Sequence, residues 1–322
     1  MHPAFSVIFL TTLIGVGQGL FLALFFSQIA VAMNFIPSQG SQFYALGSLV
    51  SVLFLGAGLV ASVFHLGRPE RAWRSAAMWR TSWLSREVIV LPLFMMAVVV
   101  YGALHFFGFD KNLFGENPAG TVTFIVGALG AVLCFALFIC TGMIYACLKF
   151  LQEWHTVLTP INYTLLGMAS GYMLVTLLAT YIVPDNIDSY ADAAIALTLI
   201  AFIFRSASLV RNKRIKHKSS LQSAIGIKHN KIQQKAQGAM GGSFNTREYF
   251  HGKKAAFVKS IKWLFLVLVF PVPVILVSIG LVTNIPAIFF VAFIVQYAGL
   301  IAERWFFFAQ ANHPQNLYYQ TI

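Results

Sequence analysis

A histidine and a glutamate stand at the two ends of one polar segment between long apolar runs. His65 closes the run over residues 43–65, and Glu87 opens the run over residues 87–108. An imidazole titrates near neutral pH, so it can donate a hydrogen bond and then a proton, and a carboxylate can relay a further proton. Quinone reduction needs both electrons and protons, and this pair is therefore a candidate catalytic pair for quinone chemistry.

The polar segment that joins these two residues is rich in arginine. Arg68, Arg71 and Arg74 follow His65 closely. Guanidinium groups stabilise negative charge that develops on an oxygen atom during a reaction. The same arginines could instead hold lipid head groups, and an interfacial histidine and glutamate could simply anchor their helices.

Other polar side chains interrupt the apolar runs, where they are costly in a bilayer and are therefore candidates for function. The further candidates for quinone binding are Gln18, Glu303 and Arg304. Glu303 and Arg304 could also form a structural ion pair. Arg205 is a further ionisable residue in such a run, and His105 is interpreted as an interfacial histidine at the opposite membrane surface.

The elements that must position these residues are membrane helices. Of the 322 residues, 58% are hydrophobic and only 10% are charged, against roughly 25% charged residues in soluble domains. The apolar runs are unbroken rather than alternating, which favours an all-α integral membrane protein over a β-barrel. Eight transmembrane helices are predicted over residues 5–33, 43–65, 87–108, 119–147, 160–183, 192–210, 261–283 and 287–309. Pro271 and Pro273 predict a kink in the seventh.

The distribution of lysine and arginine predicts the orientation of the bundle. Residues 211–262 carry thirteen of these residues against one acidic residue, Glu248. The connections on the other side contain a single basic residue, Lys111. Both termini and the loop over residues 66–86 are therefore expected on the cytoplasmic side of a bacterial inner membrane.

Three segments organise the chain. Residues 1–210 contain six helices, residues 211–260 form a basic cytoplasmic loop, and residues 261–322 contain two helices and a tail. The loop is polar at first, and its stretch over residues 238–251 carries glycines and aromatics, which suits contact with the inner leaflet or with a partner protein. Because positive-inside bias explains its charge, the loop does not predict nucleic-acid binding.

Neither a metal centre nor a haem is predicted in this chain. Cys134, Cys140 and Cys147 lack the Cys-x-x-Cys spacing of iron–sulfur and zinc sites. A membrane b-type haem requires two axial ligands on facing helices. His65 has no intramembrane histidine opposite it, and His155 lies in a loop.

The polar segment and several other motifs resemble the membrane anchor subunit of the dimethyl sulfoxide reductase family of molybdenum enzymes. The principal motifs are His65-Leu66-Gly67-Arg68-Pro69-Glu70-Arg71-Ala72 and Ser82-Trp83-Leu84-Ser85-Arg86-Glu87. Supporting matches are Gly17-Gln18, the segment from Trp154 to Pro160, and Glu303-Arg304. The resemblance extends over the whole chain and agrees with the count of eight helices.

The resemblance implies a function and a set of partners. Anchors of this family bind quinone, either ubiquinone or menaquinone, with His65 and Glu87 at the positions of the quinone-site histidine and glutamate. They carry no metal and dock an iron–sulfur subunit, which in turn docks a molybdopterin catalytic subunit. Because charge bias places the His65 loop in the cytoplasm, this chain is most similar to the branch whose catalytic subunits face the cytoplasm and oxidise sulfite. The His2-Pro3-Ala4-Phe5 opening, the motif over residues 241–248 and the aromatic C-terminal end agree with that branch.

Three other interpretations of the sequence remain open. The chain could be the quinol-oxidising anchor of a reductase for dimethyl sulfoxide or another oxyanion, because the direction of electron flow depends on potentials that the sequence does not contain. A secondary transporter is less favoured, since such folds show inverted repeats and polar groups near the membrane midplane. A purely structural tether, with quinone bound elsewhere, is the third.

Overall fold

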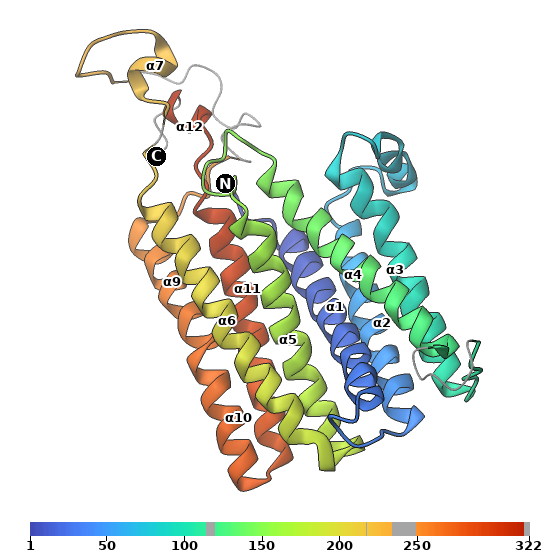
Figure 1. The fold of residues 1–322 in the computed structure, drawn as a ribbon. Coiled ribbons are helices and arrows are strands. Elements are labelled where there is room, and N and C mark those ends of the chain that lie inside the picture. The colour runs from blue at the N-terminus through green and yellow to red at the C-terminus, as the bar shows by residue number, and fades with distance from the viewer. Residues whose placement is uncertain (114–119, 217, 234–248, 319–322) are drawn as a thin grey trace.

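Eight membrane-length helices form the bundle in the computed structural model, which describes residues 1–113, 120–216, 218–233 and 249–318 (Figure 1). They are α1 (Phe5–Ala32), α2 (Ser41–Val63), α3 (Trp83–Phe106), α4 (Val122–Ala146), α5 (Leu158–Ile182), α6 (Ile187–Lys213), the broken span α9 (Ala255–Val269) with α10 (Pro271–Thr283), and α11 (Pro286–Ala309). These described residues contain no β-strand, only an isolated bridge between Asn112 and Thr121. The predicted all-helical class and the count of eight spans are confirmed.

Short elements fill the connections between the spans. They are the 3₁₀ helices η1 (Pro69–Met78) and η3 (Pro184–Asn186), and the short helices α7 (Leu221–Ile225) and α12 (Gln315–Tyr318). The loop motif over residues 241–248 and the last residues of the tail, 319–322, lie outside the described residues. In Figure 1, η1, α7, α12 and the N-terminal end of α1 all lie at the same end of the bundle.

The helices α3 and α9 begin before the apolar runs that predicted them. The Ser82 side chain caps α3 by accepting a hydrogen bond from the Ser85 amide at 3.4 Å, so Glu87 lies inside the helix rather than at its first residue. Similarly, α9 begins at Ala255 rather than at residue 261, because lysine stems can cover apolar surface while the ammonium groups reach water.

The seventh span breaks at its prolines, as predicted. Because Pro271 and Pro273 lack amide hydrogens, the carbonyls of Val267 and Val269 lose their helical partners, and α9 ends at Val269. The Gln296 side chain of α11 donates a hydrogen bond to the Val269 carbonyl at 3.3 Å. An unpaired carbonyl is costly in hydrocarbon, so this contact compensates for the break.

The centre of the bundle is a close crossing of α1 and α5. A Cβ atom added to Gly19 would lie 2.0 Å from the Gly167 carbonyl oxygen, and one added to Gly171 would lie 2.0 Å from the Gly19 carbonyl carbon. Only glycine permits these two backbones to approach so closely. This crossing fixes the position of α1, which carries Gln18 one residue before the contact.

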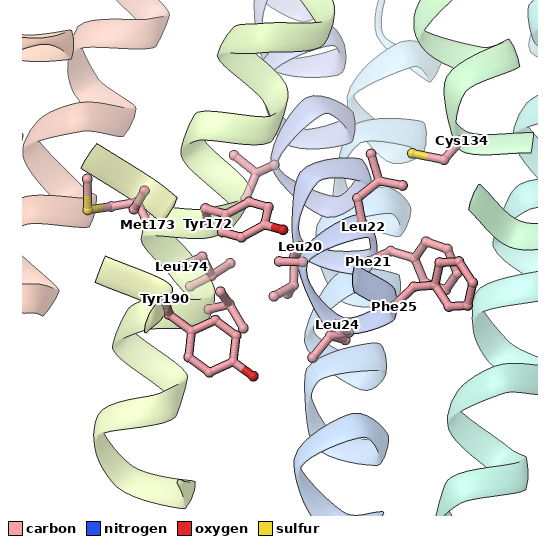
Figure 2. Packing of buried hydrophobic residues seen from close by; sticks show 14 of the residues in the cluster. Leu20, Phe21, Leu22, Leu24, Phe25, Cys134, Tyr172, Met173, Leu174 and Tyr190 are labelled. Carbon is pink, nitrogen blue, oxygen red and sulfur yellow. The ribbon is translucent and has the colours of Figure 1, made fainter. Parts of the chain in front are cut away.

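Aromatic and aliphatic side chains fill the bundle below the crossing. Figure 2 shows Phe21 and Phe25 on one side of α1 and Tyr172 with Tyr190 on the other. Phe21 is completely buried and meets the rings of Phe94 and Tyr101 edge to face, with centroids 5.4 and 5.5 Å apart. Such pairs add to the stability that burial alone provides. The packed layer separates the Gln18 region from the opposite end of the bundle.

Candidate functional site

A small, mainly apolar cavity with several polar residues in its walls lies between α1, α3, α4, α5 and α11. Five of its polar lining residues are Gln18, Glu87, Thr141, Tyr163 and Arg304, and its apolar lining includes Leu10, Ile14, Phe138, Leu166 and Leu300. It encloses about 30 Å³, which is room for one or two water molecules. Polar groups from five helices therefore converge on one small space inside the apolar bundle.

Glu87 occupies the α3 wall of this cavity. It is half-buried, and its Oε1 accepts a hydrogen bond from the Thr141 hydroxyl of α4 at 2.5 Å. A carboxyl group in this setting can bind or release a proton while a neutral hydroxyl partner stays in place. The geometry suits a proton-exchanging group.

Gln18 occupies the α1 wall and is almost completely buried. Its Nε2 donates to the Cys134 carbonyl of α4 at 3.0 Å. This bond between two helices fixes the orientation of the amide. Gln18 thus combines a structural contact with a polar surface toward the cavity.

Arg304 belongs to a buried ion triad centred on Glu303. Arg205 Nε lies 2.6 Å from Glu303 Oε1, and Arg304 Nε lies 2.5 Å from Glu303 Oε2. Arg205 and Glu303 have side chains only 1% and 0% exposed. The triad links α6 to α11 and has a formal net charge of +1, because one carboxylate serves two guanidinium groups.

The guanidinium group of Arg304 faces the cavity side of the triad. It lies over the Tyr163 ring at 4.0 Å and over the Phe307 ring at 5.1 Å. Its Nη1 is buried and has no hydrogen-bond partner among the described residues. A buried donor without a partner is unusual, and here it lies beside a cavity that a ligand or a water molecule can enter.

His65 lies apart from this cavity. It follows the last residue of α2, Val63, is exposed, and does not line the cavity wall. Partial burial lowers the pKa of its imidazole below the usual 6.5. The structure therefore places His65 and Glu87 at the same end of the bundle in different surroundings, one at the surface and one inside.

The three arginines of the polar segment are also outside the cavity. Arg68, Arg71 and Arg74 are exposed on and beside η1. Arg71 approaches Glu70 at 3.9 Å, and Arg74 lies over the Trp73 ring at 5.5 Å. Of the predicted quinone-binding set, the structure brings together Gln18, Glu87 and Arg304, with Glu303 directly behind Arg304.

Some residues of the cavity were not predicted. Thr141 and Tyr163 are uncharged residues in apolar runs, where hydroxyl groups are common, so no sequence signal separates them from ordinary core residues. Arg205 did carry a signal, as an arginine within an apolar run. Its partner was not identified, since Glu303 is distant in sequence. Within the described ranges, no three His, Cys, Asp or Glu side chains gather as a metal site would require.

Comparison with known proteins agrees with the pattern of helices and polar residues. Residues 1–319 match the family model described as DMSO reductase anchor subunit (DmsC). The chain is 55% identical over 324 residues to a sulfite dehydrogenase subunit of Allochromatium vinosum, with both chains covered completely. The predicted resemblance is confirmed, and the chain belongs to the DMSO reductase anchor subunit family, as a multi-pass membrane subunit of an oxidoreductase complex.

Proposed function

We propose that this chain exchanges electrons and protons with the quinone pool, as the membrane subunit of a complex that oxidises sulfite at the cytoplasmic face. The observation that supports it most is the convergence of Glu87, Gln18 and Arg304 on one cavity inside the membrane region. A proton-exchanging carboxyl group and a fixed cation that line the same cavity can supply a proton and stabilise negative charge, and quinone reduction uses both.

The roles of the residues follow from their positions. Arg304 Nη1 is free to donate to a quinone carbonyl oxygen and to stabilise negative charge there. Glu87 supplies a proton, with the Thr141 hydroxyl orienting its carboxyl group. His65, exposed beyond the end of α2 and at the same end of the bundle as Glu87, exchanges protons with water. The Gln18 amide holds α1 against α4 beside the position proposed for the quinone ring.

The size of the cavity places a condition on binding. A quinone ring is larger than about 30 Å³, so aliphatic side chains of the lining must move apart when it enters. Leu10, Leu166 and Leu300 are unbranched at Cβ and can change rotamer at modest cost. The isoprenoid tail would leave between helices into lipid.

The partner subunits bring the electrons. In this proposal an iron–sulfur subunit docks on the end of the bundle that carries η1 and α12, and a molybdopterin subunit docks on it. Sulfite is favoured over dimethyl sulfoxide for two reasons. The full-length relative is named as a sulfite dehydrogenase subunit, and the lysine and arginine bias orients the η1 end toward the cytoplasm.

Glu87→Gln and Arg304→Gln in the purified complex test this proposal. Sulfite oxidation with an artificial electron acceptor should persist, while quinone-linked turnover of Glu87→Gln should fall by roughly 10²–10⁴-fold, the usual contribution of a general acid. Binding of a fluorescent hydroxyquinoline N-oxide, which mimics the head group, should weaken in Arg304→Gln. Normal quinone turnover and normal probe binding in both variants would show that quinone binds elsewhere.

A further inference from the structure

A groove with several lysines lies on the outside of the bundle, where α6 ends and α9 begins. It consists of two adjoining cavities of about 700 and 420 Å³, which share Lys262, Phe306, Gln310 and Asn312. We call it the lysine groove. Its charged lining consists of Lys213, Lys253, Lys259, Lys262 and the Met1 amino group, with Glu153 as the acidic residue.

The floor of the lysine groove is apolar. Phe306 and Ala309 belong to the last turn of α11, Leu209 and Val210 lie near the end of α6, and Val258 lies in the first turn of α9. The helix α9 packs against α11 (Figure 1), and the end of α6 lines the groove together with Lys262 of α9. The groove therefore joins a hydrocarbon-like base to a cationic rim.

The groove lies at the depth where lipid head groups meet a membrane protein, because its apolar floor belongs to the ends of three membrane-length helices and the rest of its lining lies mostly in the connections beyond them. Trp263, next to Lys262, is 57% exposed, and Lys262 Nζ lies 5.2 Å from its ring centroid. Exposed tryptophan with lysine at a helix end marks the membrane interface.

A hydrogen-bond donor in the groove lacks a partner. Gln310 Nε2 is buried and makes no hydrogen bond within the part of the chain that the structure describes. Gln310 lines both cavities, between lysines of α6 and α9. An oxygen-rich anion would accept from this amide and lie near the ammonium groups, so the donor and the charges favour the same kind of ligand.

We propose that the lysine groove binds an anionic phospholipid, with its phosphate near Lys259, Lys262 and Gln310 and its acyl chains against the Phe306 side of the groove. A phospholipid matches both the cationic rim and the apolar floor of the groove, since its head group is anionic and its chains are apolar. A soluble anion would leave the apolar floor exposed. This inference is independent of the quinone proposal, because no residue of the lysine groove lines the cavity beside Glu87.

The test uses the complete purified complex with matched charge variants. The groove variant replaces Lys253, Lys259 and Lys262 with glutamine. The control variant makes the same change in charge at Lys216, Lys228 and Lys231, which are exposed and line neither cavity. Phosphatidylglycerol and phosphatidylcholine retained after detergent exchange are counted by native mass spectrometry, and the affinity for each added lipid is measured.

The wild-type complex and the control variant should retain phosphatidylglycerol in preference to phosphatidylcholine. Each lysine near an anionic surface strengthens binding about fivefold, so the groove variant should lose affinity on the order of a hundredfold. Gln310→Leu keeps every charge and should also weaken binding, which keeps the test valid if the groove variant does not assemble.

Three results would overturn the proposal. Equal losses in the groove and control variants would show a general effect of surface charge. Displacement of the lipid by millimolar inorganic phosphate would show a free-phosphate site. Absence of retained anionic lipid, together with cross-links from Lys259 to another subunit, would show a protein interface instead.

Discussion

Glu303 of α11 and Arg205 of α6 form an ion pair of 2.6 Å in which neither side chain is exposed to solvent. The guanidinium group of Arg205 also lies over the Phe265 ring at 5.4 Å. Glu303 is thereby held from the side opposite Arg304. Because Arg304 is paired with the same carboxylate, the Arg205–Glu303 ion pair limits the positions that Arg304 can adopt beside the cavity.

Glu303→Gln is expected to destabilise the protein strongly, because it leaves Arg205 and Arg304 buried without a counter-charge. Breaking a buried ion pair from one side typically costs about 3–5 kcal/mol. Unfolding in detergent measures the loss. Glu70→Gln is the matched control, since the Glu70–Arg71 pair is long and exposed, and such pairs contribute about 1 kcal/mol or less. Equal stability of the two variants would contradict a structural role for the triad.

Replacement of His65 by alanine should impair quinone-linked turnover without affecting assembly of the complex. The residue is exposed and outside the helices, so the complex should assemble and oxidise sulfite with an artificial acceptor at its normal rate. Quinone-linked turnover should fall because the imidazole no longer exchanges protons with water, but by less than in Glu87→Gln, which removes the group that supplies the proton. Near-normal quinone-linked turnover would remove His65 from the mechanism.

The pH profile provides an independent test of the same residue. Partial burial lowers the pKa of His65 from 6.5, so the protonated donor becomes populated only as the pH falls below that value. If proton donation by His65 limits the rate, turnover with quinone should rise through a midpoint below pH 6.5 as the solution is acidified. The midpoint should disappear in His65→Gln. A midpoint that persists in this variant belongs to another group.

Gly19→Ala should destabilise the bundle although alanine favours helices. The new methyl group would lie 2.0 Å from the Gly167 carbonyl oxygen, so two backbones must separate, and overpacking of this kind costs about 1–3 kcal/mol. Gly56→Ala in α2 is the control, because its added Cβ meets no atom within 4 Å. Thermal unfolding should show a loss for the first variant alone. Similar stabilities would mean that α1 and α5 can adjust.

The orientation predicts opposite behaviour of reporters at the two ends of the bundle. A fusion after Ile322 should behave as cytoplasmic, and a fusion in the connection at η3 should be active as a periplasmic phosphatase. The reason is the lysine and arginine excess of residues 211–262. An active phosphatase after Ile322 would reverse the orientation and remove the argument for cytoplasmic sulfite oxidation.

Docking of the iron–sulfur subunit is expected on the surface formed by η1, at the same end of the bundle as α12. Trp73 and Trp79 are 71% and 52% exposed, and exposed aromatics with arginines are typical of interface centres. Cross-linking of the complex should connect the partner to η1. Cross-links confined to the η3 connection would place the partner at the wrong end.

The sequence by itself determined the class of the protein, the number of spans and the family. Length and hydropathy decide whether a segment can cross hydrocarbon, and the broken seventh span follows from Pro271 and Pro273, whose missing amide hydrogens act locally. Gln18, Glu87 and Arg304 were also identifiable, because a polar side chain in an apolar run is costly in a membrane and is therefore a candidate for function. The motif around His65 was specific enough to indicate the family.

Only the tertiary structure decided which of these residues meet. Helix contacts depend on rotation about each axis and on the glycine crossing of α1 and α5, and neither is encoded in hydropathy. The structure thus shows that Arg68, Arg71 and Arg74 lie outside the cavity and that Thr141 and Tyr163 line it. It also showed that Arg205 pairs with Glu303. Sequence spacing could not suggest this contact, because the two residues are distant in the chain and meet only when α6 and α11 pack together.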